Sequence, residues 1–302
     1  MKKANLLHNP TAGEKDFSKD ELVAHIIEGG FDCSYNSVKK KGWDDFSVDT
    51  DFLVIAGGDG TVRRVTKELL SRPKLDKHYP IALLPHGTAN NIGSTLNIQG
   101  SVKDIISSWH DSVIKKFDIG KVYGLEKDLF FLEGFGCGIF PRLMKFMGKI
   151  EDPPGSTVED RVKLARAALY QIVLDYKAQN CRVVADGREF SGKYILVEAM
   201  NTRSIGPKLE MALTADPGDG ELDLVLVPEA DQRRFAEYIL NRIEGKTDDF
   251  DFKVIKAKNI DLEWEGKDVH LDDERIKVEK SLNVRIEIEP GMLEFMVSET
   301  RI

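Results

Sequence analysis

Residues 54–65 read VIAGGDGTVRRV, and this stretch decides the fold. A short apolar run over 51–56 ends in the glycine-rich segment 57–61, and apolar residues at helical spacing follow over 61–71. An apolar run bounded by glycines is typical of a buried parallel strand. A turn of this kind, leading into a helix, exposes backbone N–H groups that can bind a phosphate. The carboxylate of Asp59 inside the turn would repel a phosphate unless a positive charge lies between them.

The same order of elements repeats along the first third of the chain. Runs typical of strands lie at 4–8, 31–38, 51–56 and 81–85, and helical periodicity lies at 17–28, 61–71 and 88–96. Alternating strands and helices predict an α/β nucleotide-binding domain with a mostly parallel sheet, which we place at residues 1–115.

The pattern changes in the remainder of the chain. Strand-like runs dominate after residue 180, and apolar and polar residues alternate over 260–265 and 284–289. Such alternation is typical of antiparallel strands with one solvated face. Helical periodicity returns at 157–177 and 231–244. We therefore predict a β-rich, antiparallel, sandwich-like second domain over residues 116–297.

Composition excludes several classes of protein. The 302 residues are 41% hydrophobic and 31% charged, with a net charge of −8, as in a soluble protein of two domains that does not take nucleic acid as its main partner. Runs of about 18 apolar residues and a signal peptide are both missing, so we expect neither a transmembrane helix nor export. Three scattered cysteines predict reduced thiols in the cytoplasm, and the histidine spacing disfavours zinc.

Three polar loops follow three of the predicted strands, at 8–16, 57–61 and 85–91. The carboxyl ends of parallel strands meet at one edge of a sheet, where ligands bind. Helices beginning after the second and third loops would present their N-termini to an anion, so the pattern indicates a nucleotide phosphate site. The sequence has no P-loop, and Val62 breaks a dinucleotide fingerprint. Each loop alone could equally be a tight turn.

Taken in order, NPTAG (9–13), GGDGT (57–61) and PHGTANN (85–91) resemble the catalytic domain of diacylglycerol kinases, a family that includes sphingosine kinases and soluble bacterial lipid kinases. The resemblance continues through FDIG (117–120), GFGCG (134–138), ALTADPGDGELDLVLV (212–227) and LDDE (271–274). It implies ATP as the donor, a lipid hydroxyl as the acceptor, and an active site in a cleft between the domains. It also implies that residues 298–302 pack back on the first domain.

The resemblance assigns nucleotide binding to nine loop residues: Asn9, Thr11, Gly58, Asp59, Gly60, Thr61, Gly87, Thr88 and Asn90. Asp59 matches a carboxylate linked to Mg²⁺, often through water, and such a cation would bridge the carboxylate and the phosphate. Asp118 in FDIG matches a second acidic member of this network. Its alternative is a strand-end aspartate at the crossover between domains.

LDDE matches the late acidic motif of the family, in which the aspartate is the general base. Here the base would be Asp272, with Glu274 as a second catalytic carboxylate. If the segment is extended, the two side chains point to one face. The alternative is a solvated acidic turn.

DPGDGEL matches a structural metal loop of the relatives. The Asp219 carboxylate, with the backbone carbonyls of Asp216 and Glu221, would hold Mg²⁺ or Ca²⁺ there. The alternative is a plain turn before the strand that follows.

Two departures from the family pattern bear on activity. Asn91 stands where the family usually has aspartate, and Asp273 stands where it usually has glycine. They motivate one alternative to a lipid kinase, a nucleotide or lipid sensor without turnover. A second alternative is a kinase of a soluble substrate such as NAD, because NAD kinases and phosphofructokinases share GGDG.

The leading prediction is a cytoplasmic, peripherally membrane-associated lipid kinase. The segment 131–150 mixes apolar and basic residues and could meet a membrane surface, or it could be ordinary core. The long helix predicted over 157–177 could cap a lipid pocket. The oligomeric state stays open, a homodimer included.

Overall fold

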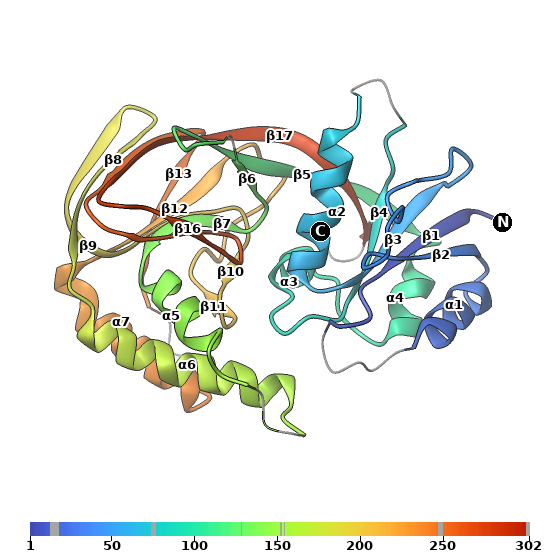
Figure 1. Cartoon of the computed structure of the whole chain (residues 1–302), viewed down its shortest axis with the longest axis horizontal. Helices are drawn as coiled ribbons and strands as arrows, with labels where there is room; N and C mark the ends of the chain where they lie inside the picture. The colour runs from blue at the N-terminus through green and yellow to red at the C-terminus, as the bar shows by residue number, and fades with distance from the viewer. Residues whose placement is uncertain are drawn as a thin grey trace. The chain divides into compact units, whose positions relative to one another are not determined.

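The computed structural model describes residues 1–12, 18–73, 77–127, 129–151, 153, 155–246 and 250–299. The chain divides into two compact units, of which unit 1 comprises Met1–Phe117 with Gly291–Ile302 and unit 2 comprises Asp118–Pro290. Two strands, β5 (Ser112–Tyr123) and β17 (Leu282–Ser298), run from one unit into the other along the chain (Figure 1). Of the predicted terminal segment 298–302, residues 300–302 lie outside the described residues.

Unit 1 contains a parallel sheet in the order β2, β1, β3, β4, β17. Its strands besides β17 are β1 (Lys3–His8), β2 (Asp32–Ser37), β3 (Phe52–Gly57) and β4 (Ile81–Pro85). The pairings β1–β2, β1–β3, β3–β4 and β4–β17 are all parallel. The mostly parallel sheet predicted from the sequence is confirmed.

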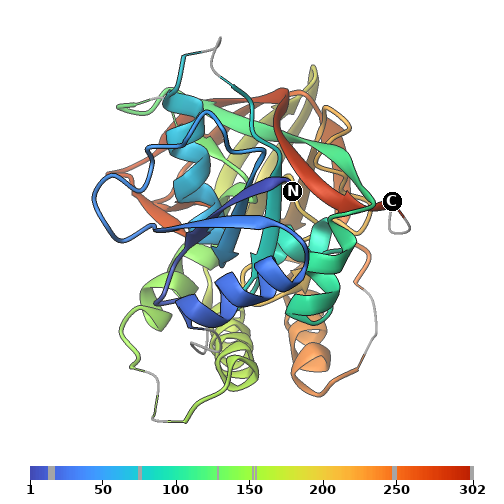
Figure 2. The ribbon, with the colours of Figure 1, turned by 90° about the vertical axis from the view of Figure 1, so that its right-hand side faces the viewer.

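Helices cover both faces of this sheet. They are α1 (Lys19–Glu28), α2 (Asp59–Ser71), α3 (Asn91–Thr95) and α4 (Val102–Ser108). Leu22 of α1 and Ile105 of α4 pack with Leu6 and Val54 in one buried cluster, and Figure 2 shows α1 and α4 side by side on that face. Neighbouring strand residues such as Leu53 point to the opposite face, where α2 lies.

Unit 2 is built from antiparallel strands, as predicted. Beyond the parts of β5 and β17 that belong to it, they are β6 (Leu129–Phe131), β7 (Gly134–Gly138), β8 (Gln179–Ala185), β9 (Arg188–Met200), β10 (Ser204–Ile205), β11 (Leu209–Glu210), β12 (Leu222–Pro228), β13 (Lys253–Ala257), β14 (Asn259–Trp264), β15 (Asp268–Leu271) and β16 (Glu274–Lys277). β7, β8 and β12 all pair with β9, and β15 joins β7 to β16.

Two cores stabilise unit 2, and β12 contributes to both. Leu224 and Leu226 point into the core between the strands, whereas Val225 and Val227 point toward the helices. These helices are α5 (Ile139–Met147), α6 (Val158–Asp175) and α7 (Gln232–Ile243), and a short 3₁₀ helix, η1 (Glu229–Asp231), precedes α7. α6 begins with a capping box between Thr157 and Asp160, which explains why the longest predicted helix starts there.

The apolar segment 131–150 is largely core. Residues 131–141 are buried throughout, from the end of β6 through β7 to the first turn of α5, while Phe146 is exposed on the last turn. In the described part of the chain, no helix is long and apolar enough to cross a membrane. Cys33, Cys137 and Cys181 are all free thiols.

Candidate functional site

The first two predicted loops of unit 1 are joined by side chains. Asn9 follows β1, and its Nδ2 donates to Oγ1 of Thr61 in the first turn of α2 at 3.0 Å. Its Oδ1 accepts from both the backbone N–H and the hydroxyl group of Thr11, at 3.3 and 2.9 Å. Residues 52 positions apart therefore form one polar edge at the carboxyl ends of β1 and β3.

Two predicted loops approach so closely that both need glycine. A Cβ atom on Gly87 would lie 2.4 Å from the Cα of Gly58, and a Cβ on Gly58 would lie 2.8 Å from the Cα of Gly87. Asn90, with φ of 54°, closes the third loop: its Oδ1 accepts the Gly87 N–H and its Nδ2 donates to the Gly87 carbonyl. The resemblance assigns these glycines to binding of the nucleotide phosphates. The close packing of the two loop backbones requires glycine at both positions even without a phosphate.

Asp59 has a structural partner that the sequence did not indicate. Its carboxylate accepts the backbone N–H groups of Asn91 and Ile92, at 2.8 and 3.1 Å, and so caps the N-terminus of α3. Our expectation that the helix after PHGT offers these N–H groups to an anion is wrong, because a carboxylate of the chain already occupies them. The role of Asp59 toward Mg²⁺ remains a prediction.

Two further predicted residues complete the loops of unit 1. Gly60 is exposed on the first turn of α2, and Thr88 is half-buried in the segment between β4 and α3. The two basic residues that follow GGDGT lie on α2, where the guanidinium of exposed Arg64 lies 5.5 Å from the Trp43 ring.

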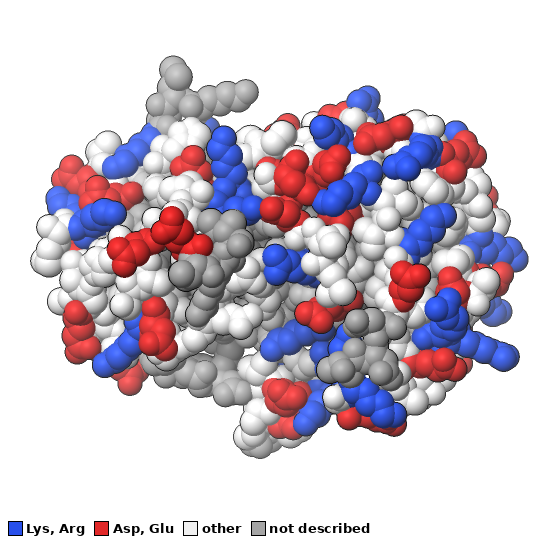
Figure 3. All heavy atoms as spheres, turned by 180° about the vertical axis from the view of Figure 1, so that it is seen from behind, with Lys and Arg blue, Asp and Glu red and all other residues white. Residues whose placement is uncertain are grey.

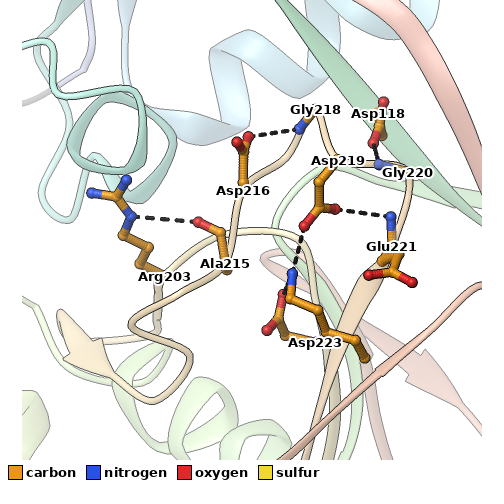
Figure 4. Close-up of polar contacts among 10 residues, drawn as sticks. Asp118, Arg203, Ala215, Asp216, Gly218, Asp219, Gly220, Glu221 and Asp223 are labelled. Atoms are coloured by element: carbon orange, nitrogen blue, oxygen red, sulfur yellow. Dashed lines mark hydrogen bonds and ion pairs between the residues drawn. The ribbon is translucent and has the colours of Figure 1, made fainter. Parts of the chain in front are cut away.

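In unit 2, Asp118 is buried and held at two points by one loop. Its backbone N–H donates to the carbonyl of Pro217 at 2.5 Å, and its Oδ2 accepts the N–H of Gly220 at 2.7 Å. Figure 4 shows the Asp118 carboxylate directed at Gly220. The FDIG motif and the DPGDGEL motif are therefore one structural feature.

Asp272 lies in a turn and not on an extended segment. β15 ends at Leu271 and β16 begins at Glu274, and Asp272 adopts a φ of 49° between them. Its carboxylate is buried and accepts the backbone N–H groups of Leu132, Glu133 and Gly134 at 2.8–3.2 Å. Glu274 is exposed. The expectation that both carboxylates point to one face is wrong, because the chain reverses between them.

Asn201, which belongs to none of the motifs, links Asp272 to the backbone of Asp118. Its Nδ2 donates to the carbonyls of Asp118 and Leu132, at 2.9 and 3.1 Å, while the Leu132 N–H donates to Asp272. Asn201 is 1% exposed and directly follows the buried second half of β9. A polar residue at the end of an apolar run was the one available signal.

His270 and Glu198 form a buried pair beside the same turn. His270 Nε2 lies 2.9 Å from Glu198 Oε2, and its Nδ1 lies 3.0 Å from the backbone carbonyl of Asp272. Burial lowers the pKa of His270, but the charge and hydrogen bond of Glu198 and the Asp272 carbonyl outweigh it, so the pKa is raised above 6.5. The pair was not predicted, because 72 residues separate its members.

A lysine from β13, Lys256, contacts the predicted metal loop. Asp219 Oδ1 accepts the Glu221 N–H at 2.9 Å, and its Oδ2 lies 2.5 Å from the ammonium of Lys256. The Asp216 carbonyl accepts the Asp219 N–H at 3.2 Å. Among the described residues, no group of three or more His, Cys, Asp or Glu side chains could hold a metal ion. As arranged, the loop does not fit a divalent cation, because a cation already lies on its carboxylate.

The structure thus brings the predicted residues into two groups. The loop residues of unit 1 form one, and in unit 2 Asp118, Asp272 and the loop 216–221 form the other through Asn201 and backbone contacts. On the face seen in Figure 3, acidic and basic side chains are interspersed without a large area of one sign.

Comparison with known proteins matches both halves of the chain. The model described as "Diacylglycerol kinase catalytic domain" matches residues 3–122, and the model "YegS C-terminal NAD kinase beta sandwich-like domain" matches residues 156–297. Diacylglycerol kinase of Bacillus subtilis (strain 168) is 24% identical over 262 residues, which cover 82% of this chain and 80% of that protein. Diacylglycerol kinase of Staphylococcus aureus (strain MRSA252) is 24% identical over 240 residues, which cover 76% of this chain and 71% of that protein.

The fold recurs in solved structures. The crystal structure of a diacylglycerol kinase from Bacillus anthracis str. Sterne superimposes with a TM-score of 0.71 at 20% identity, covering 100% of this chain and 98% of that one. Another solved chain from that organism gives a TM-score of 0.76 at 21% identity over 100% and 98% of the two chains. With both domain models matched in order, residues 3–122 belong to the diacylglycerol kinase catalytic-domain family and residues 156–297 form a YegS-type C-terminal domain, so the chain is a distant homologue of diacylglycerol kinases.

Proposed function

We propose that this protein is an ATP-dependent lipid kinase, which transfers the γ-phosphate of ATP to the hydroxyl group of a lipid such as diacylglycerol. The family membership supports phosphoryl transfer, and relatives named diacylglycerol kinase that align with three quarters or more of the chain support the lipid class. The protein would act in the cytoplasm at a membrane surface, where its substrate lies, and would not bind nucleic acid.

The observation that carries the proposal is the setting of Asp272. A general base must meet the attacking hydroxyl in a fixed orientation. Three consecutive backbone N–H groups, from Leu132 to Gly134, hold this carboxylate in place. Leu132 also connects it through Asn201 to the backbone of Asp118, another acidic residue of unit 2 to which the resemblance gives a catalytic role. A solvated acidic turn would need none of these contacts.

ATP and Mg²⁺ complete the proposal. The loops that contain Asn9, Gly58 and Gly87 would hold the nucleotide, and Asp59 and Asp118 would serve the magnesium ion. When bound, Mg²⁺ neutralises the charge of the transferred phosphoryl group. The chain would then orient the lipid hydroxyl and accept its proton at Asp272.

A second candidate is a kinase of NAD. The C-terminal model is described as similar to an NAD kinase β-sandwich domain, and that observation favours it. Incubating the folded protein with ATP, Mg²⁺ and NAD, and measuring NADP, separates this candidate from the first.

The deciding experiment is transfer of labelled phosphate from ATP to a panel of lipids in mixed micelles. We expect a labelled product from diacylglycerol or a related lipid, and loss of that product in Asp272→Asn. Asp273→Asn is the matched control, because Asp273 occupies the same turn but is exposed. If the folded protein binds ATP and labels no acceptor, the proposal is wrong, and a nucleotide or lipid sensor is the better description.

A further inference from the structure

Lys256 meets two carboxylates beside the loop 216–221. Its Nζ lies 2.5 Å from Asp219 Oδ2 and 3.7 Å from Asp223 Oδ2. The strand register places it there, because Lys256 on β13 is directly opposite Asp223 on β12. The side chain of Asp223 is 2% exposed, whereas those of Asp219 and Lys256 are 27% and 36% exposed. The ammonium group therefore reaches from the surface to a partly buried acidic position.

Three other oxygen atoms of this loop accept hydrogen bonds from within the chain. Asp219 Oδ1 accepts the Glu221 N–H, which Figure 4 shows, and the Asp216 carboxylate accepts the Gly218 N–H at 3.0 Å. The Asp216 carbonyl accepts the Asp219 N–H. A divalent ion at Asp219 would have to displace the ammonium group or share the carboxylate with it, and two cations at this distance repel each other.

We infer that Lys256 takes the place of a divalent cation in this loop, so that unit 2 needs no structural metal ion. One positive charge between two carboxylates removes most of their mutual repulsion, as a bound cation would do. A lysine that is part of the chain does this at any concentration of free metal. The loop would therefore stay ordered in the presence of a chelator.

The loop 216–221 also holds Asp118. The carbonyl of Pro217 accepts the Asp118 N–H, and the Gly220 N–H donates to the Asp118 carboxylate. Lys256 would act as a positioning residue for Asp118 by fixing this loop, and this last step rests on the proposed function. The substitution of a metal ion by lysine does not rest on it.

The test is the thermal stability of the protein without nucleotide, in EDTA and in millimolar Ca²⁺ or Mg²⁺. We expect the same melting temperature for the native protein in all three solutions. Lys256→Met removes the charge but keeps an unbranched apolar stem, and we expect it to lower the Tm in EDTA by about 2–4 °C. Because Asp219 and Asp223 then face each other without a cation, Ca²⁺ or Mg²⁺ should restore most of this loss.

Two control variants sharpen the result. Lys258→Met removes an exposed lysine just beyond the end of β13, and it should show neither the loss nor the response to metal. Lys256→Arg keeps the positive charge and should stay insensitive to metal. A calorimetric titration with Ca²⁺ should detect binding to Lys256→Met and none to the native protein.

Stabilisation of the native protein by Ca²⁺ or Mg²⁺, or its destabilisation by EDTA, would overturn the inference. The inference would also be overturned if Lys256→Met, like Lys258→Met, showed neither a lower Tm in EDTA nor a rise in Tm with added metal. If Lys256→Met does not fold, the titration of the native protein still decides. A lack of lipid phosphorylation in every variant would count against the proposed function and would leave the metal result standing.

Discussion

His270 joins the carboxylate of Glu198 to the backbone of Asp272, with its two ring nitrogens 2.9 and 3.0 Å from their partners. All three residues are buried. Nδ1 faces the carbonyl oxygen of Asp272 and must carry a proton to form a hydrogen bond with it. Nε2 can donate to the carboxylate of Glu198 only when the ring carries a second proton. When His270 is protonated, the pair is a buried charged contact, and it fixes the turn containing the predicted base.

This contact predicts a dependence of stability on pH. The pKa of His270 in the folded protein is raised above 6.5, so its contribution to the free energy of unfolding is complete below that pH and is lost as the pH rises through the folded value. We expect the difference in unfolding free energy between the native protein and His270→Gln to shrink over this range, measured by urea denaturation. His78→Gln is the control, because His78 is exposed, and equal differences at acidic and alkaline pH would contradict the prediction.

Asp272→Asn should lose both activity and stability. An amide has one acceptor oxygen, and its NH₂ group would face backbone N–H groups that now donate to a carboxylate. Leaving a buried donor without an acceptor costs about 1–3 kcal/mol of unfolding free energy. Denaturant unfolding of this variant beside Asp273→Asn measures that cost. Unfolding curves that coincide would show that the N–H contacts at Asp272 do not stabilise the turn.

Gly87→Ala should separate two loops of unit 1. The new Cβ would lie 2.4 Å from the Cα of Gly58, so the backbone must move. Overpacking of this kind costs about 1–3 kcal/mol, and we expect ATP affinity to fall with it. Calorimetric ATP titration and thermal unfolding measure the two effects. Gly192→Ala is the control, because its Cβ would meet Tyr194 no closer than 3.6 Å; equal behaviour of the two variants would refute the explanation.

Two substitutions of Asp59 separate its role as a helix cap from the role of its charge. Asp59→Ala removes the cap of α3, and loss of a helix cap costs about 0.5–2 kcal/mol. Asp59→Asn keeps one acceptor oxygen for the N–H groups of Asn91 and Ile92 but removes the charge. We expect both variants to lose phosphoryl transfer, while Asp59→Asn keeps more of the stability. Full activity in Asp59→Asn would exclude a role for the charge in magnesium binding.

The elements that sequence reasoning located best have a local cause. Leu22 and Ile26 recur at helical spacing after Ser18. In the structure both are buried residues of α1, and a capping box at Ser18 begins this helix. The apolar run before Gly57 is β3, buried along its whole length. Periodicity and glycine boundaries are visible within a few residues, so these elements could be read from the chain.

The site was harder to predict, because its contacts are distant in sequence. Asp272 lies 138 to 140 residues from the N–H groups that hold it, and the Asp118 carboxylate lies 102 residues from Gly220. The resemblance selected Asp272 and Asp118 as candidates but could not show that Asp272 starts a hairpin turn. Neither Asn201 nor Glu198 belongs to a motif, and the pairing of β7 with β9 and β15 brings both of them close to the turn of Asp272.

The position of β17 in the chain affects how the protein folds during its synthesis. Phe295 of β17 is fully buried, pairs with Ile81 and contacts the ring of Phe117, so residues near the C-terminus complete the sheet of the N-terminal unit. A fragment ending at Phe117 would expose an edge of β4 and the apolar surface that Phe295 covers. During synthesis, unit 1 can therefore finish folding only after all of unit 2 has emerged. Although unit 1 begins the chain, it is the unit whose last strand is synthesised last.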